Sequence, residues 1–323
     1  MNSTAEAEAE VYDSIIIGGG AAGLSAAQSL GRALRKTLVL DTGTPRNRYA
    51  AHMHNILGHD GTSPAELLRS GRAEAASYGV EFLDAGVHRV SESTREQGPR
   101  ELVVTLDSGT VLFARSVIAA SGLTDELPAI PGLAQRWGTS VLHCPYCHGW
   151  EVRDQRLAVL GVSPLSIHQA QLLRQWSDQL TFFSADAGEL SAETQDRLAA
   201  RGVTVESSRV LEVSGDGPLL HAAHLEDGRS IPVDAIFTGG RLVPRDRYLR
   251  GLDLTREDTM AGSFLKVDAM GQTSHERIWA VGNVASPMAT VPLSMGMGSF
   301  AGGAANAALL NEEFDLAVAA KNK

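Results

Sequence analysis

Short apolar runs that lead into glycine-rich turns mark the regular elements of this chain. Residues 14–17 read Ser-Ile-Ile-Ile, and a continuous β-branched run of this kind is typical of a buried parallel strand. A glycine-rich turn at 18–23 follows at once, and residues 24–34 have helical character. Residues 37–40 read Thr-Leu-Val-Leu and predict a second strand. The order strand, turn, helix and strand predicts a βαβ unit.

The same plan begins again in the middle of the chain. Residues 157–160 form another buried-strand run, which Gly161 follows, and a helical stretch at 167–176 precedes a strand at 180–183. The repeat predicts a second βαβ unit. We therefore predict an α/β fold with two doubly wound, Rossmann-like domains.

Composition and charge exclude several classes of protein. Of the 323 residues, 43% are hydrophobic and 20% charged, which fits a packed globular protein. No apolar stretch approaches the roughly 20 residues that span a bilayer. The net charge is −10 without a basic cluster, so we expect no nucleic-acid partner. Residues 1–10 are acidic and lack the apolar core of a signal peptide, so we predict a disordered tail and a cytoplasmic protein.

The first glycine-rich turn has the pattern of a dinucleotide-binding site. Gly18, Gly20 and Gly23 occupy the three glycine positions between a strand and a helix, with Ala22 inside the turn. The first glycine permits the tight turn, the second lets a pyrophosphate approach, and the third allows close helix–strand contact. Asp41 ends the next strand, where an acid accepts ribose hydroxyls. The sequence therefore predicts a dinucleotide at this turn.

The second turn has lost most of this pattern. Gly161 is kept, but Ser163 and Ser166 replace the other two glycines, and Pro164 removes a backbone donor. Residues 184–189 contain two acids and no arginine or lysine to neutralise a 2′-phosphate. We expect no NADPH at this turn, and the alternative that a divergent loop binds nicotinamide through other contacts stays open.

The only two cysteines of the chain, Cys144 and Cys147, form a Cys-x-x-Cys pair within His-Cys-Pro-Tyr-Cys-His-Gly-Trp-Glu. A zinc site needs about four converging ligands, and His143 and His148 each adjoin a cysteine, an arrangement in which side chains rarely converge. A structural disulfide or a pair of inert cysteines would also account for the motif, although disulfides in a reducing cytosol are mostly catalytic. We favour a redox-active pair and no metal.

Together these features resemble the low-molecular-weight thioredoxin reductase family across the whole chain. Members of that family follow the second cysteine with Asp-Gly and keep an intact NADPH turn, whereas this chain has His148-Gly149 and a degraded turn. The combination is similar to the flavin-dependent dithiol oxidases of natural-product pathways, which close the disulfides of gliotoxin, holomycin and romidepsin.

This resemblance implies FAD as the cofactor. Residues 117–122 look like the family strand that ends in a small hydroxyl residue and glycine, and 278–284 look like its Gly-Asp segment, with Asn283 replacing the acid. The segments 45–47 and 58–61 are also similar to the oxidase subgroup. With the first turn and Asp41, the predicted FAD residues are Gly18, Gly20, Ala22, Gly23, Asp41, Arg46, Asn47, His59, Ser121, Gly122, Gly282 and Asn283. We interpret His52, His54 and His59 as residues of a loop that lines the cofactor pocket, and not as metal ligands.

The resemblance also implies a domain plan. We expect a discontinuous FAD domain at 1–120 and 245–323, with 121–244 inserted as a degenerate NADPH-type domain that carries the cysteines. The Gly- and Pro-rich segments 122–131 and 238–244 are the predicted crossings between the domains. Family members are homodimers, so we expect a homodimer here.

The implied activity is oxidation of a small-molecule dithiol. A substrate thiolate would attack Cys144, and Cys147, the position next to the flavin in the family, would pass electrons through FAD to oxygen, giving H2O2. His148 is the acid–base candidate, because the pKa of histidine lies nearest neutral pH, with a surface role as the alternative and His143 as a weaker candidate. The rival hypotheses are a thioredoxin reductase-type enzyme with NADPH or another donor, and a non-enzymatic flavoprotein.

Overall fold

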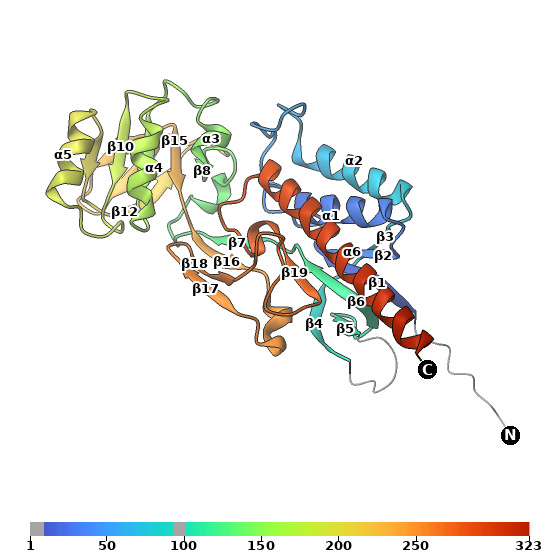
Figure 1. The fold of residues 1–323 in the computed structure, drawn as a ribbon. Coiled ribbons are helices and arrows are strands. Elements are labelled where there is room, and N and C mark those ends of the chain that lie inside the picture. The colour runs from blue at the N-terminus through green and yellow to red at the C-terminus, as the bar shows by residue number, and fades with distance from the viewer. Residues whose placement is uncertain (1–9, 94–100, 323) are drawn as a thin grey trace. The chain divides into compact units, whose positions relative to one another are not determined.

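The computed structural model of the protein describes residues 10–93 and 101–322, so the predicted tail lies outside the described residues except for Glu10. The chain forms two compact units (Figure 1). Unit 1 consists of Met1–Arg46, Ala65–Thr124 and Pro244–Lys323, and unit 2 of Asn47–Pro64 and Asp125–Val243. In the described ranges, no helix combines the length and the apolar character that crossing a bilayer requires.

A seven-stranded sheet forms the centre of unit 1. Its strands are β1 (Val11–Ile17), β2 (Thr37–Asp41), β3 (Glu81–Asp84), β4 (Val87–Glu92), β5 (Leu102–Leu106), β6 (Val111–Ala119) and β19 (Ile278–Ala280). The order is β3-β2-β1-β6-β5-β4, and β19 pairs with the second half of β6, beyond the part that β5 occupies. The strands β3, β2, β1, β6 and β19 are parallel, and β5 is antiparallel to β4 and β6.

The apolar run of β1 is continuous because both faces of this sheet are covered. Ile15 and Ile17 lie in one apolar cluster and Ile16 in another, since successive side chains of a strand point to opposite faces. All three are at most 5% exposed. Burial on both faces therefore removes the polar alternation that a half-exposed strand would show.

Helices α1 (Ala21–Arg32), α2 (Pro64–Ser77) and α6 (Val291–Lys321) belong to unit 1, and α1 packs along α6 (Figure 1). Two glycines of α6 permit this contact. A Cβ at Gly298 would lie 2.0 Å from the Ala22 carbonyl oxygen, and one at Gly302 would lie 2.8 Å from that of Ala26. The small residues of the last helix thus bring it against the helix that follows the first glycine turn.

Unit 2 is built on a second sheet, in which all strands are parallel. It contains β8 (Val141–Leu142), β9 (Leu157–Leu160), β10 (Leu180–Phe183), β11 (Thr204–Glu206) and β15 (Ala235–Thr238), in the order β11-β10-β9-β15-β8. The helices of the unit are α3 (Pro145–His148), α4 (Leu165–Leu173) and α5 (Ala192–Ala200). A smaller antiparallel sheet contains β12 (Val210–Ser214), β13 (Ala222–Leu225) and β14 (Ser230–Pro232). The predicted α/β fold class, with two Rossmann-like sheets, is confirmed.

The chain passes between the units four times: at the two ends of Asn47–Pro64, within β7 (Leu123–Glu126) and within β16 (Arg241–Pro244). The strands β7 and β16 pair with each other. The remaining elements are β17 (Arg256–Thr259), β18 (Gly262–Leu265), η1 (Ala134–Arg136), η2 (Arg247–Leu252) and η3 (Gly282–Val284).

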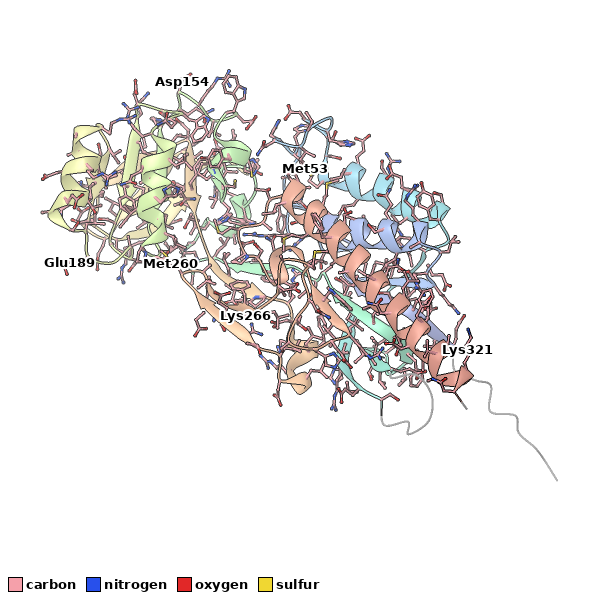
Figure 2. All side chains as sticks on the ribbon, in the orientation of Figure 1. Met53, Asp154, Glu189, Met260, Lys266 and Lys321 are labelled. Carbon is pink, nitrogen blue, oxygen red and sulfur yellow. The ribbon has the colours of Figure 1, made fainter. Side chains whose placement is uncertain are left out.

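The segment Asn47–Pro64 clusters with unit 2, although it lies inside the stretch 1–120 that the sequence assigns to the FAD domain. Its buried side chains are Met53, labelled in Figure 2, and Ile56, which are 7% and 5% exposed. The backbone of Tyr49 also lies so close to Gly138 of unit 2 that a Cβ there would be 3.0 Å from the Tyr49 carbonyl oxygen.

Candidate active site

The two cysteines lie at the start of a single helical turn in unit 2 and within it. Cys144 is the N-cap of α3, with extended backbone angles, and Pro145 is the first helical residue, where its missing N–H costs no hydrogen bond. The Cys147 amide donates to the Cys144 carbonyl at 3.1 Å. Both cysteines are half-buried. The sequence therefore folds the pair onto one tight turn, the arrangement that reversible disulfide exchange requires.

The residue after His148 must be glycine because the turn is packed against Trp176. A Cβ at Gly149 would lie 2.7 Å both from the Pro145 carbonyl oxygen and from the Trp176 ring. The Tyr146 ring meets Trp176 edge to face, with centroids 6.0 Å apart. Trp176 thus fixes the turn that carries the cysteines.

His148 is the half-buried base candidate at the end of this turn. Burial lowers the pKa of His148 below its ordinary value, and the positive charges of His54 and His143 act in the same direction. The carboxylate of Glu151 opposes them and raises the pKa of His148. An imidazole with a lowered pKa is mostly neutral at pH 7, so it can accept a proton from a thiol.

His143, the weaker candidate, is tied to the backbone around it. Its Nδ1 lies 3.4 Å from the Thr238 carbonyl oxygen, and its own carbonyl accepts a hydrogen bond from the Gln169 side chain at 2.6 Å. In the described part of the chain, no three His, Cys, Asp or Glu side chains gather as metal ligands would.

The first glycine turn has the shape that a dinucleotide needs. Gly18 has φ +112, and a Cβ there would lie 2.4 Å from the Ala120 carbonyl oxygen. A Cβ at Gly23 would lie 1.9 Å from the Gly18 carbonyl oxygen, so both glycines are required by packing. Gly20 differs, because a Cβ there meets nothing within 4 Å. Gly20 is also the N-cap of α1 without a side-chain cap, which leaves an open cradle at a helix N-terminus for a pyrophosphate.

Asp41 lies beside this cradle at the end of β2. A Cβ at Gly19 would be 2.7 Å from the Asp41 Oδ2, which places the carboxylate against the turn. The acid therefore stands where it can accept hydrogen bonds from a ribose. Ala22 packs elsewhere: its methyl lies 3.0 Å from the position a Cβ would take at Gly282, which has φ +66.

The replacement of the family's acid by Asn283 has a structural reason. Its Nδ2 donates to the carbonyls of Ser286, Pro287 and Ala289 at 3.0–3.2 Å, which a carboxylate cannot do. Its Oδ1 accepts a hydrogen bond from the Arg46 guanidinium at 3.2 Å. Asn283 thus closes the loop before α6 and joins it to the predicted cofactor residue Arg46.

The other predicted FAD residues fall in two places. The Ser121 hydroxyl donates to the Arg245 carbonyl at 2.7 Å and lies 2.9 Å from the Tyr248 hydroxyl, a partner that the sequence did not suggest. Gly122 follows with φ +71. Asn47 and His59 belong to the segment that clusters with unit 2, so the structure does not group them with the glycine turn.

Two amides of the second glycine turn donate to groups of the turn itself. The Val162 amide donates to the buried Ser166 hydroxyl at 3.1 Å, and the Ser166 amide donates to the Ser163 carbonyl at 3.0 Å. A Cβ at Gly161 would lie 2.7 Å from that of Ala187. Two amides of this turn are therefore engaged within the loop and are not free to donate to a phosphate.

The structure also shows charged partners that sequence reasoning missed. Asp186, one of the two acids predicted at the phosphate position of the second turn, pairs with Arg209 at 2.8 Å. Glu151 lies 3.3 Å from His54 of the 47–64 segment. The one sequence signal for Glu151 was its position three residues after His148. No local pattern indicated the pairing of Asp186 with Arg209.

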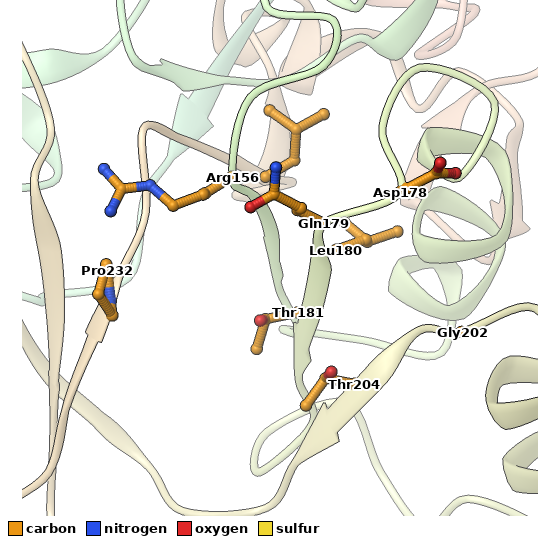
Figure 3. Close-up of a pocket in the computed structure, with 9 residues that line it drawn as sticks. Arg156, Asp178, Gln179, Leu180, Thr181, Gly202, Thr204 and Pro232 are labelled. Carbon is orange, nitrogen blue, oxygen red and sulfur yellow. The ribbon is translucent and has the colours of Figure 1, made fainter.

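An open depression of about 280 Å³ lies at the amino ends of β9, β10 and β11 (Figure 3). Ligands of parallel α/β sheets bind at the carboxyl ends of the strands, so this depression is not the nucleotide site. Arg156 at its rim pairs with Asp234 at 2.5 Å. Its lining residues are Arg156, Leu157, Asp178, Gln179, Leu180, Thr181, Gly202, Thr204 and Pro232.

Unit 1 carries a dinucleotide cradle at Gly20, and unit 2 carries the turn with Cys144 and Cys147, here called the thiol turn. Together they define a flavoprotein disulfide oxidoreductase. Residues 12–298 match the model of the pyridine nucleotide-disulphide oxidoreductase family, and the chain belongs to that family. It binds FAD, as predicted, and the Gly20 cradle with Asp41 fits this cofactor.

Individual relatives agree with this assignment. The thioredoxin reductase sirT of Leptosphaeria maculans is 30% identical over 92% of this chain and 94% of its own length. The crystal structure of HlmI is 42% identical, with a TM-score of 0.90 over 96% of both chains. An oxidoreductase from Agrobacterium tumefaciens is 39% identical, with a TM-score of 0.86 over 93% of this chain and 99% of that one. The resemblance to thioredoxin reductase-like flavoproteins is confirmed.

Proposed function

We propose that the protein is a flavin-dependent dithiol oxidase that forms an intramolecular disulfide in a small-molecule natural product. The observation that carries the proposal is the turn with Cys144 and Cys147 and its half-buried, weakly basic His148, in a chain whose second glycine turn binds the Val162 amide within itself. The first feature supports exchange with a dithiol, and the second argues against electron supply from NADPH. The 42% identity to HlmI supports an activity shared with that protein.

The proposed exchange begins from the oxidised pair. A substrate thiolate attacks the Cys144 sulfur, the Cys144–Cys147 bond breaks, and Cys147 leaves as a thiolate. The second substrate thiol loses its proton to His148 and attacks the first substrate sulfur, which closes the product disulfide and releases Cys144. The two cysteines now hold the two electrons as thiols or thiolates, and His148 holds the proton of the second substrate thiol; the proton of the first thiol was released when its thiolate formed.

Oxidation of the two cysteines back to the disulfide requires an acceptor for two electrons. When bound, FAD would supply the two-electron redox chemistry that returns the pair to the disulfide, with O2 as the final acceptor and H2O2 as its product. Cys147 is the thiol that we assign to this exchange. One dithiol and one O2 thus become one disulfide and one H2O2. The residues that would hold FAD are those of the Gly20 cradle, together with Asp41.

The alternative is a thioredoxin-disulfide reductase that draws electrons from NADPH or from another donor. The name of the sirT relative favours it, as does the pairing of Asp186 with Arg209, which removes a negative charge that would repel a phosphate. The hydrogen bond from the Val162 amide to Ser166 counts against it, because that donor is lost to a pyrophosphate.

Oxygen consumption separates the two functions. With purified holoenzyme and dithiothreitol as the probe dithiol, we expect oxygen uptake with one H2O2 per disulfide formed. NADPH should reduce the flavin at least about 100-fold more slowly than the dithiol does. This factor corresponds to the loss of one or two hydrogen bonds to charged phosphate groups. Fast bleaching of the flavin by NADPH, followed by reduction of thioredoxin, would establish the reductase instead.

We further propose a cytoplasmic homodimer. A cysteine pair that cycles between thiol and disulfide suits a reducing compartment. The helix α6 carries exposed apolar side chains that a second copy would cover, namely Phe300, Leu310, Phe314 and Leu316. Analytical ultracentrifugation should give twice the chain mass, and Phe314→Glu should shift the equilibrium toward the monomer. A monomeric parent protein at micromolar concentration would refute this assembly.

A further inference from the structure

The segment 47–64 has a defined shape in unit 2, next to the thiol turn. Two backbone hydrogen bonds close it into a loop, from the Met53 amide to the Thr62 carbonyl at 2.9 Å and from the Gly61 amide to the Met53 carbonyl at 2.8 Å. Met53 and Ile56 anchor it by burial. His54, between these anchors, is therefore held in a fixed position relative to α3.

Each ring nitrogen of His54 faces a carboxylate. Its Nε2 lies 3.3 Å from Glu151 Oε1, and its Nδ1 lies 3.2 Å from Asp60 Oδ1. The imidazolium form can donate to both carboxylates, whereas neutral imidazole can donate to only one. The His54 side chain is 26% exposed, Glu151 40% and Asp60 73%, so the contact with Glu151 is the more shielded of the two.

Glu151 is at the same time the carboxylate that acts on His148. Its charge raises the pKa of His148, while the charges of His54 and His143 lower it. The other element packed against α3 is α4, whose only titratable group is the exposed His168. Arg153 nearby donates to the Trp150 carbonyl at 2.7 Å and stacks on the Trp150 ring. Glu151 is thus the carboxylate through which the loop can influence the base.

We propose that His54 is a positioning residue of the thiol site: it holds the Glu151 carboxylate, whose charge acts on His148, and Asp60 fixes His54 in turn. The inference rests on the proposed function only in assigning His148 the role of base. Because the loop 47–64 brings His54 to this place, the segment serves the thiol chemistry of unit 2, a role different from the cofactor contact that the sequence suggested for its histidines.

The direct test measures the pKa of His148 by NMR in the full-length holoenzyme, with His54→Asn made in two backgrounds. In the parent protein, His54→Asn should lower the pKa of His148, because Glu151 is released and its stabilising charge moves away. In Glu151→Gln, the same change should raise the pKa, because only the loss of the positive charge on His54 remains. A shift in the same direction in both backgrounds would overturn the proposal.

Turnover gives a second readout. His54→Asn should lower kcat/KM for the dithiol by about 5- to 10-fold in the parent protein and by less than about 2-fold in Glu151→Gln, since residues that act as a unit are not additive. Equal losses in the two backgrounds would contradict the coupling. If the parent protein oxidises no dithiol, the proposed function fails, but the NMR titration still decides the role of His54.

Two further variants guard against trivial effects. Asp60→Asn alters an exposed residue and should change the pKa of His148 in the same direction as His54→Asn in the parent protein, by a smaller amount. His221→Asn is the matched control, because His221 forms an exposed pair with Asp216 in the same unit at 3.9 Å. It should leave both the pKa of His148 and turnover unchanged; an effect as large as that of His54→Asn would refute the specific role.

Discussion

Replacement of Cys147 by serine is expected to lower kcat for dithiol oxidation by about 10⁴-fold, because a hydroxyl cannot form the disulfide that accepts the substrate's electrons. Cys144→Ser and the double variant should show losses of the same size, since the two thiols act as one group. Oxygen uptake under saturating dithiol measures the effect.

The two single variants should nevertheless differ in whether they form a stable mixed disulfide with a small molecule. Cys147→Ser keeps the thiol that we assign to substrate exchange, so incubation with a small disulfide should leave a stable mixed disulfide on Cys144, visible by mass spectrometry. Cys144→Ser should form much less of this adduct. Ser207→Ala, at an exposed position of unit 2, is the control and should retain full activity. A fully active Cys147→Ser enzyme would refute the proposed electron path.

The second large effect concerns the glycine turn. Gly23→Ala places a methyl group 1.9 Å from the Gly18 carbonyl oxygen, so α1 must move away from β1. We expect the free energy of unfolding to fall by about 3 kcal/mol and the isolated protein to lose most of its FAD. Urea denaturation of the FAD-free protein and the flavin absorbance of the purified protein measure the two quantities.

Gly20→Ala is the matched control, because a Cβ there meets nothing in the protein. The free energy of unfolding of the FAD-free protein should fall by no more than about 1 kcal/mol, the difference between glycine and alanine at an N-cap. The Kd for FAD should still rise at least about 10-fold, because the methyl group enters the space of the pyrophosphate. Unchanged FAD affinity in Gly20→Ala would show that the cradle is not the pyrophosphate site.

Local sequence was sufficient to predict the βαβ units, because their strands and turns are determined by neighbouring residues. The predicted strand at 37–40 corresponds to β2, and that at 157–160 to β9. Helix bounds were less accurate. The helix predicted at 24–34 begins at Ala21 in the structure, directly after the extended N-cap Gly20. The prediction began too late because the small residues Ala21 and Ala22 do not show the apolar pattern of a helix.

The contacts around His148 could not be predicted from the sequence, because they join residues that are distant in the chain. His54 and Glu151 are far apart in the chain, and the fold of unit 2 brings their side chains to 3.3 Å. The pairing of Asp186 with Arg209 likewise joins the loop after β10 to the residue before β12. A sequence pattern marks which residues can carry charge, but the distances between such residues depend on tertiary packing.

The discontinuity of unit 1 has a consequence for biosynthesis. Its sheet gains β19, and its first helix gains the glycine contacts of α6, only from residues near the end of the chain. Unit 2 contains nothing beyond Val243, so on the ribosome it can fold before the other unit is complete. The nascent protein would then present a finished thiol turn before it can retain its flavin, so cofactor capture would be among the last steps of maturation.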